Sequence, residues 1–231
     1  MKIVIVSAIF PPQIGGPATY AKRLADDLVK NNYQVEVVSY GKAPVVLKHF
    51  LFCWRVFWAA WDADLIFAQD PVLAGGPSAL VGWMLKKPII LRIGGDFSWE
   101  YARQHCAIND DPDDFQKRTN YPLIIKIIRW TQRAVCDKSA KVIVPSFYLR
   151  GVIENWPVDL AKIEIVYNAP RDFVNSEPRA LIRKKFGWEE NFIILSIGRL
   201  TPWKGFDGLV DLMSKFAKTQ PRARLVIVGS G

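Results

Sequence analysis

The sequence has few of the residues on which several classes of site depend. Among its 231 residues there are only three cysteines and two histidines. The cysteines are Cys53, Cys106 and Cys136, an odd number in which no pair has the spacing of metal ligands. This pattern argues against a disulfide scaffold and is typical of a reducing compartment. We therefore expect a cytoplasmic protein.

Long apolar runs are also missing. No uninterrupted apolar run approaches the ~20 residues that a membrane-spanning helix needs. The N-terminal stretch MKIVIVSAIFPP has a short apolar run that turn residues follow at once, with no small-residue cleavage site. This pattern predicts a buried first strand and not a signal peptide.

Residues 45–61, VVLKHFLFCWRVFWAAW, are the most aromatic stretch. Lys48 and Arg55 are seven residues apart and so share one helical face. Four aromatic residues give this stretch a large apolar area: Trp54, Phe57, Trp58 and Trp61. Such an area is compatible with a helix at a membrane interface. Burial against a sheet, with aromatic rings exposed at one edge, is the alternative and the favoured interpretation.

The chain has a surplus of positive charge. Half of its residues are hydrophobic and about a quarter are charged, as in ordinary globular proteins. The net charge is +9, and residues 173–231 contribute ten Lys or Arg against five Asp or Glu. Such a balance favours phosphate-bearing partners, including nucleotides, nucleic acid and anionic membrane surfaces, although solvated surface cations would give the same totals.

Strand patterns alternate with helical patterns along the chain. Strands are predicted at residues 2–7, 35–40, 64–68, 88–93, 141–144, 163–167, 192–197 and 224–228. Helices are predicted after residue 16, at 45–61, and between strand 64–68 and about residue 85. Further helices are predicted at 123–135, 147–155, 178–186 and 206–218. Helix 123–135 carries Ile124, Ile127, Ile128 and Thr131 on one side.

The remaining stretches suggest loops and a domain boundary. Residues 94–121 are predicted to form a long irregular segment with an acidic run at Asp110–Asp114, and 168–177 a linker. The alternation predicts an α/β fold of doubly wound parallel sheets with helices on both faces. We expect one Rossmann-like domain at residues 1–172 and the first part of a second at 173–231.

Two loops at strand ends carry the main functional signals, because ligands of such sheets bind beyond the carboxyl ends of the strands. Gly15 and Gly16 follow the first strand and precede a helix, so backbone N–H groups there can approach an anion. A plain strand-to-helix turn is the alternative. The loop is not GxGxxG, and no acidic residue ends the second strand, which argues against a dinucleotide site.

The second loop, Gly198-Arg199-Leu200-Thr201-Pro202-Trp203-Lys204-Gly205, also joins a strand to a helix. Arg199 presents a planar fork and Lys204 a point charge, and both suit a diphosphate beside a helix N-terminus. If either cation stood alone, a surface role would be the simpler interpretation.

Several short motifs occur in one order along the chain. They are Gly15-Gly16 followed by Leu24-Ala25-Asp26-Asp27-Leu28, then Val144-Pro145-Ser146, Asn168 after a strand, and Gly198-Arg199-Leu200 with Lys204-Gly205. In these motifs the sequence resembles the family 4 (group 1) retaining glycosyltransferases, which have the GT-B fold. The Gly-Arg-Leu…Lys-Gly block is the most specific part.

The resemblance implies an enzyme that transfers a sugar from a nucleotide-sugar donor to a glycan or lipid-linked acceptor with retention. It implies that Gly15, Gly16, Arg199 and Lys204 bind the donor diphosphate, and that Ser146 and Asn168 line the cleft. It implies no cofactor and no metal, since basic side chains stabilise the leaving diphosphate. We also expect a role in polysaccharide biosynthesis, a peripheral contact with the inner face of the membrane, and no nucleic-acid partner.

The chain departs from the family pattern at Gly94-Gly95-Asp96, where many relatives have His-Gly. Asp96 and Glu100 follow a predicted strand and are candidates to serve the acceptor hydroxyl. Capping of the next helix is an equal alternative for Asp96, because Asp is a good N-cap residue.

The chain also ends at Gly231, before the position of the family's paired-glutamate motif. We therefore expect the 231-residue chain alone to be inactive. Two other classes stay open at this point: a Rossmann-type nucleotide-binding enzyme and a basic nucleic-acid-binding module.

Overall fold

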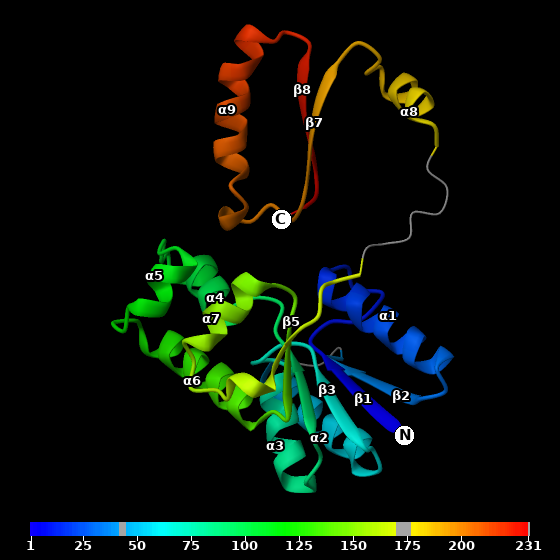
Figure 1. Ribbon diagram of the computed structural model, residues 1–231, viewed down its shortest axis with the longest axis vertical. Helices are drawn as coiled ribbons and strands as arrows, with labels where there is room; N and C mark the ends of the chain where they lie inside the picture. The colour runs from blue at the N-terminus through cyan, green and yellow to red at the C-terminus, as the bar shows by residue number, and fades with distance from the viewer. Residues whose placement is uncertain (42–44, 170–176, 231) are drawn as a thin grey trace. The chain divides into compact units, whose positions relative to one another are not determined.

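Six parallel strands form the sheet of the first unit, in the order β2-β1-β3-β4-β5-β6 (Figure 1). The strands are β1 (Lys2–Ser7), β2 (Gln34–Ser39), β3 (Leu65–Ala68), β4 (Ile89–Arg92), β5 (Lys141–Val144) and β6 (Ile163–Ile165). Valine and isoleucine dominate them, as expected for strands that are covered on both faces.

The structure is a computed structural model that describes residues 1–41, 45–169 and 177–230. The chain separates into two compact units: residues 1–102 with 109–168, and residues 103–108 with 169–231. The predicted boundary between residues 172 and 173, and most of the predicted linker, lie outside the described residues.

The helices of residues 1–168 connect these strands. They are α1 (Gly16–Lys30), α2 (Val45–Trp61), α3 (Gly75–Leu85), α4 (Phe97–His105), α5 (Pro112–Lys117), α6 (Leu123–Lys138), α7 (Phe147–Glu154) and the short 3-10 helix η1 (Leu160–Lys162). Right-handed crossovers decide which face each helix covers. The chain moves outward from β1 to the edge strand β2 through α1, and then returns across β1 to β3 through α2. Helices α1 and α2 therefore lie on opposite faces.

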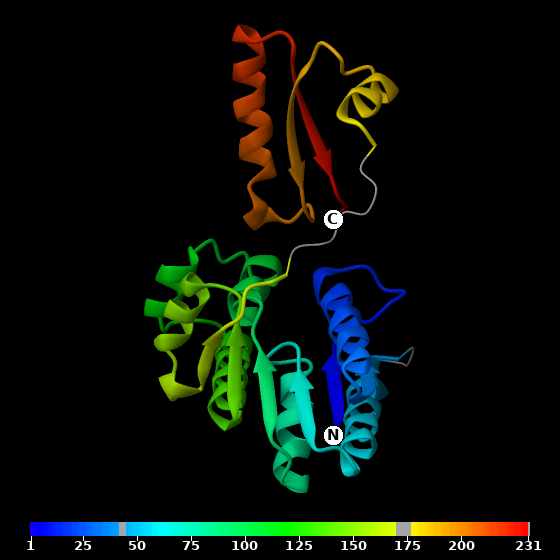
Figure 2. The ribbon, with the colours of Figure 1, turned by 45° about the vertical axis from the view of Figure 1, so that its right-hand side comes forward.

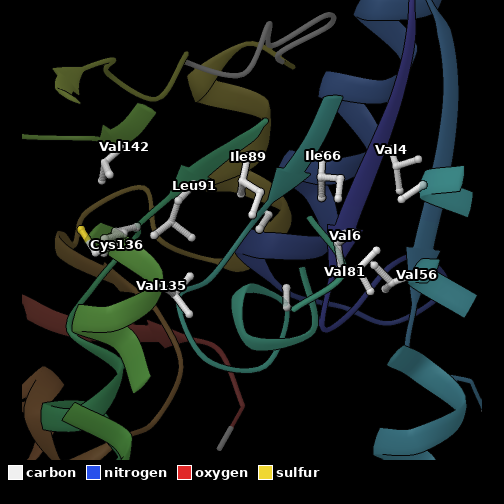
Figure 3. Packing of buried hydrophobic residues seen from close by; sticks show 14 of the residues in the cluster. Val4, Val6, Val56, Ile66, Val81, Ile89, Leu91, Val135, Cys136 and Val142 are labelled. Carbon is white, nitrogen blue, oxygen red and sulfur yellow. The ribbon is translucent and has the colours of Figure 1, made fainter. Parts of the chain in front are cut away.

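The core follows this division. On the α1 face, Ile3, Ile5 and Phe67 pack with Ala21 and Ala25 of the helix. On the other face a larger cluster joins the sheet to α2, α3, α6 and α7 (Figure 3). Its labelled members come from both layers: Val4, Val6, Ile66, Ile89, Leu91 and Val142 of the strands, and Val56, Val81, Val135 and Cys136 of the helices.

The prediction of one long irregular segment at residues 94–121 is wrong. Helices α4 and α5 lie within it. Asp111 caps α5 by accepting a hydrogen bond from the Asp114 N–H, and Pro112 occupies its first turn. An N-cap Asp followed by Pro and further acidic residues is a helix-start signature, so the acidic run marks a helix N-terminus.

The second unit contains two parallel strands, β7 (Phe192–Ile197) and β8 (Ala223–Val228). Figure 2 shows them side by side with α9 (Phe206–Thr219) alongside. Helix α8 (Arg179–Phe186) and the 3-10 turn η2 (Pro202–Lys204) complete the described part. Apolar side chains of β7 are largely exposed, including Phe192, Leu195 and Ile197. A sheet of two strands with one helix alongside leaves such side chains without a covering layer among the described residues.

Two adjacent glycines at the start of α3 provide a test of the packing. A Cβ at Gly75 would lie 2.6 Å from the backbone oxygen of Asp70 and 2.9 Å from Val135 Cγ1, whereas a Cβ at Gly76 would meet nothing within 4 Å. We expect Gly75→Ala to destabilise the first unit by about 1–3 kcal/mol through overpacking. Gly76→Ala, the matched control, should be neutral or stabilising by up to ~1 kcal/mol, because alanine favours helices. Urea unfolding measures both, and equal effects would contradict the packing.

Candidate functional site

The first helix begins at the paired glycines. Gly15 is the N-cap of α1 and Gly16 its first residue, and no side chain caps this end. A Cβ at Gly15 would lie 2.7 Å from Ile9 Cδ1, so a larger residue there would make the end of the Ile9 side chain shift. Gly16 is exposed and has no neighbour within 4 Å of a Cβ position. The backbone N–H groups at this end of α1 are therefore open to a ligand, as an anion-binding turn requires.

A buried arginine joins three segments beside this turn. Arg92 is the last residue of β4 and is 8% exposed. Its guanidinium lies 3.9 Å from the centre of the Tyr20 ring of α1, and its Nη2 donates a hydrogen bond of 2.8 Å to Asn168 Oδ1. Burial lowers the pKa of Arg92, and the nearby Tyr20 opposes that shift. The predicted cleft residue Asn168 is thus held by a residue that the sequence analysis did not select.

The loop after β4 folds closely under two charged side chains. A Cβ at Gly94 would lie 3.3 Å from Arg92 Nη1, and a Cβ at Gly95 would lie 2.5 Å from Glu100 Oε1. Glycine at both positions lets the guanidinium and the carboxylate approach the loop. Glu100 stands in the first turn of α4 and is half-buried. The Glu100 side chain therefore approaches the strand-end loop from the first turn of α4, and its role toward an acceptor stays a prediction.

The Asp96 carboxylate is buried and hydrogen-bonded, whereas a carboxylate that acts on a substrate must be accessible to it. It is 6% exposed, and its Oδ1 accepts hydrogen bonds from the N–H groups of Ser98 and Trp99 at 3.0 and 3.2 Å. Oδ1 also accepts from the Ser98 hydroxyl and Gln132 Nε2, and Oδ2 accepts from Gln116 Nε2 at 2.6 Å. This geometry favours the capping role, and a catalytic role for Asp96 stays a prediction.

Ser146 is the N-cap of α7. Its Oγ accepts a hydrogen bond of 3.2 Å from the Leu149 N–H. The residue lies directly after β5, and therefore at the same edge of the sheet as Arg92 and Asn168. In the first unit, the parallel sheet thus gathers Gly15, Gly16, Arg92, the Gly94–Glu100 loop, Ser146 and Asn168 at its carboxyl edge.

In the second unit the two strands approach each other closely beyond their ends. The Gly198 N–H donates to Val228 O at 3.0 Å, and the Leu200 N–H donates to Ser230 O at 3.1 Å. A Cβ at Gly229 would overlap the backbone oxygen of Gly198. Glycine is therefore required at position 229, and the pairing fixes where the chain leaves β7.

Arg199 and Lys204 stand in the loop that this pairing positions. Arg199 follows β7 by two residues, and Lys204 ends η2, just before Gly205 and α9. Gly205 has φ 68°, a left-handed conformation that favours glycine, and no side chain caps α9. Both cations are exposed, and neither forms an ion pair with residues that the structure describes. The loop thus offers two available cations beside a helix N-terminus.

Comparisons with known proteins connect these features to a family. Residues 178–231 match the family described as glycosyl transferases group 1. The whole chain is 28% identical to an uncharacterised glycosyltransferase of Methanocaldococcus jannaschii and covers 63% of that protein. The chain therefore spans less than two thirds of this relative.

Solved structures show the same fold. The structure of HepE from Anabaena in complex with UDP and glucose aligns with all of this chain, which covers 62% of it, at 18% identity and a TM-score of 0.69. Sucrose-phosphate synthase from Thermosynechococcus elongatus aligns with 99% of the chain, which again covers 62% of it, at 17% identity and a TM-score of 0.69. The fold is therefore the predicted GT-B type, and the comparisons support a GT-B glycosyltransferase.

The Asp96 network gives a test that separates the two roles of this residue. In Asp96→Asn, the amide nitrogen that replaces Oδ2 would face another donor, Gln116 Nε2. The Gln116 amide cannot rotate to present its oxygen instead, because that oxygen already accepts a hydrogen bond of 3.0 Å from Trp156 Nε1. We expect the first unit to lose about 1–3 kcal/mol of stability. Asp111→Ala, which removes an exposed cap, should cost about 1 kcal/mol. Urea unfolding checks both. An Asp96→Asn protein with unchanged stability but no turnover would favour the catalytic role.

Proposed function

We propose that the protein is a glycosyltransferase that moves a sugar from a nucleoside-diphosphate donor to a glycan or lipid-linked acceptor, with retention at the anomeric carbon. The observation that supports this most is the β7–α9 loop. It presents Arg199 and Lys204 beside an uncapped helix N-terminus, within residues that match the group 1 glycosyl transferases. The likeness to HepE, which was solved with UDP and glucose, supports a nucleotide-sugar donor.

The donor diphosphate is the group that this loop is suited to bind. Negative charge grows on the diphosphate as the bond to the sugar breaks. Arg199 can hold two phosphate oxygens at once, Lys204 adds a point charge, and the N-terminus of α9 adds a partial positive charge. Gly15 and Gly16 keep the diphosphate-binding role that the resemblance implies. We propose that these groups take the place of a metal or other cofactor.

The acceptor belongs to the first unit in this proposal. Glu100 is the acidic side chain at the loop after β4, and Arg92 and Asn168 form a fixed pair near it. We propose that Glu100 binds or activates an acceptor hydroxyl, and that Asp96 acts on the reaction mainly by fixing the start of α4. Ser146 lines the same edge from the start of α7.

The chain spans about 63% of the M. jannaschii relative. We propose that residues equivalent to the family's paired glutamates are needed to hold the donor sugar, so that the 231-residue chain alone is inactive. We also propose a cytoplasmic enzyme of polysaccharide biosynthesis, with a peripheral contact at the inner face of the membrane where a lipid-linked acceptor would be reached.

Substitution of the two cations tests the donor site. In the complete gene product, we expect Arg199→Ala or Lys204→Ala to weaken binding of a nucleotide sugar by about 1.5–3 kcal/mol, because each removes a charge-assisted hydrogen bond. Lys215→Ala, an exposed cation on α9, is the matched control and should leave binding unchanged. Isothermal titration with UDP- and GDP-sugars measures the effect.

The same titration addresses the other two classes of protein. A Rossmann-type enzyme of another class would prefer a ligand such as NAD, and a basic binding module would prefer DNA or RNA. Nucleotide-sugar affinity that both alanine variants retain in full would show that the diphosphate binds elsewhere.

A further inference from the structure

Five tryptophans are exposed in the first unit, and all lie on three neighbouring helices. Their exposed fractions range from 52% for Trp54 to 73% for Trp83. Within the described residues these are the only tryptophans classed as exposed. They are Trp54, Trp58 and Trp61 of α2, Trp83 of α3, and Trp130 of α6.

The rings point away from the sheet because the opposite side of each helix is buried against it. Phe52 and Val56 of α2, Val81 of α3, and Ile125 and Ile128 of α6 are core residues. Helix α3 packs against both α2 and α6, so the three helices form one layer. We call the outward side of this layer the tryptophan face; its further apolar members are Leu80, Met84, Leu123 and Ile127.

Helix α6 shows why sequence periodicity did not reveal this face. The stripe that was expected to lie on one side includes Ile124 and Ile127, which are 45% and 49% exposed. The inner side instead carries Arg129 and Gln132, which are buried and hydrogen-bonded. The helix therefore buries two polar side chains among its core residues and leaves apolar side chains exposed on its outer side, which a soluble surface alone does not require.

The aromatic rings of α2 form a continuous outer cluster. The ring centres of Trp54 and Trp58 are 5.5 Å apart, and those of Trp58 and Trp61 are 6.1 Å apart, with Phe57 between them. From the sequence alone, interfacial and buried roles for this helix are alternatives. The structure has the helix buried on one side, with adjacent indole rings exposed on the other, and indole rings are the side chains that prefer the membrane–water interface.

The charges on the same helices are mainly positive. Helices α2, α3 and α6 carry six Lys or Arg side chains and a single carboxylate, Asp137. On the opposite side of the sheet, α1 carries three cations and two carboxylates, and Lys22 and Lys30 pair with Asp26 and Asp27. Five of these six cations are at least partly exposed, since only Arg129 is buried, so the layer that carries the exposed rings also carries a surplus of positive charge.

A hollow of about 620 Å³ lies along α6 beside Trp130. Lys126, Arg129 and Arg133 line it, with Asp137 as the one acidic residue. Arg129 is engaged by the backbone oxygens of Gln116 and Arg118, but Arg133 Nε is buried with no hydrogen-bond partner among the described residues. Burial, followed by the neighbouring Arg129, lowers the pKa of Arg133. Lys126 and Arg133 give the hollow a positive charge that suits an anion.

We propose that the tryptophan face rests on an anionic phospholipid bilayer, with a lipid phosphate in the α6 hollow. Indole rings would lie at the headgroup level, and the cations would face the negative lipid surface. A second copy of the chain fits less well, because a two-fold contact through this face would oppose the same cations. The inference rests on the membrane contact in the proposed function, but not on sugar transfer.

Vesicle flotation with the full chain tests this, without donor or acceptor. We expect it to float with vesicles of phosphatidylcholine containing phosphatidylglycerol, to float far less with pure phosphatidylcholine, and to bind more weakly as salt rises. Lys126→Gln with Arg133→Gln should reduce binding about thirtyfold, since each cation near an anionic surface contributes a factor of about five to six and the two factors multiply.

Matched variants give the controls. Lys184→Gln with Lys185→Gln removes the same charge from α8 and should reduce vesicle binding much less. Trp83→Ala with Trp130→Ala should reduce binding about tenfold or more through lost apolar contact, whereas Leu181→Ala with Leu212→Ala, which removes comparably exposed apolar groups elsewhere, should not. The tryptophan emission of the parent chain should shift to the blue on the vesicles.

Three outcomes would overturn the inference: equal flotation with both lipids, equal losses in the face and control variants, or a dimer that dissociates when Trp83 and Trp130 are replaced. Nucleotide-sugar titration of the same variants separates this from the proposed reaction. If donor binding persists while flotation fails, the membrane surface is wrong and the transferase proposal stands; the reverse result would reject the donor site alone.

Discussion

The parallel pairing of the strands is the constraint on which the rest of the first unit depends. Every connection between parallel strands must cross the sheet, and right-handed crossovers assign α1 to one face and α2, α3, α6 and α7 to the other. The same arrangement brings the carboxyl ends of all six strands to one edge. Chemistry at that edge therefore comes from loops, whereas the helix layer supplies broad surfaces.

Elements governed by local pattern were predictable from the sequence. The bounds of β1, β7 and α2 were predicted correctly, because apolar β-branched runs and a long apolar helix have few alternatives. Helices α4 and α5 were missed, since they are short and depend on caps at Asp96 and Asp111. The cap residues were visible in the sequence, but a six-residue helix has almost no periodicity to detect.

The candidate site was predictable only in part, for a different reason. Glycines and cations that follow strands stand out in the sequence, so Gly15, Gly16, Arg199 and Lys204 could be selected. Arg92 could not, because its partners Tyr20 and Asn168 are distant in sequence and meet only in the folded sheet. The outward apolar side of α6 was hidden in the same way, since its inner residues Arg129 and Gln132 find buried partners that periodicity does not anticipate.

Helix α6 links the two functional surfaces inferred for the first unit. Its inner side holds Gln132, which donates to Asp96 and so fixes the start of α4, the helix that carries Glu100. Its outer side carries Trp130 and the cationic hollow. A helix that packs into the core has a fixed orientation, because close-packed interiors do not deform continuously. A bilayer bound at the outer side would therefore hold the Glu100 loop at a constant position relative to the lipid headgroups. That geometry suits an acceptor whose sugar is attached to a lipid, since the same contact would bind the membrane and present the acceptor hydroxyl.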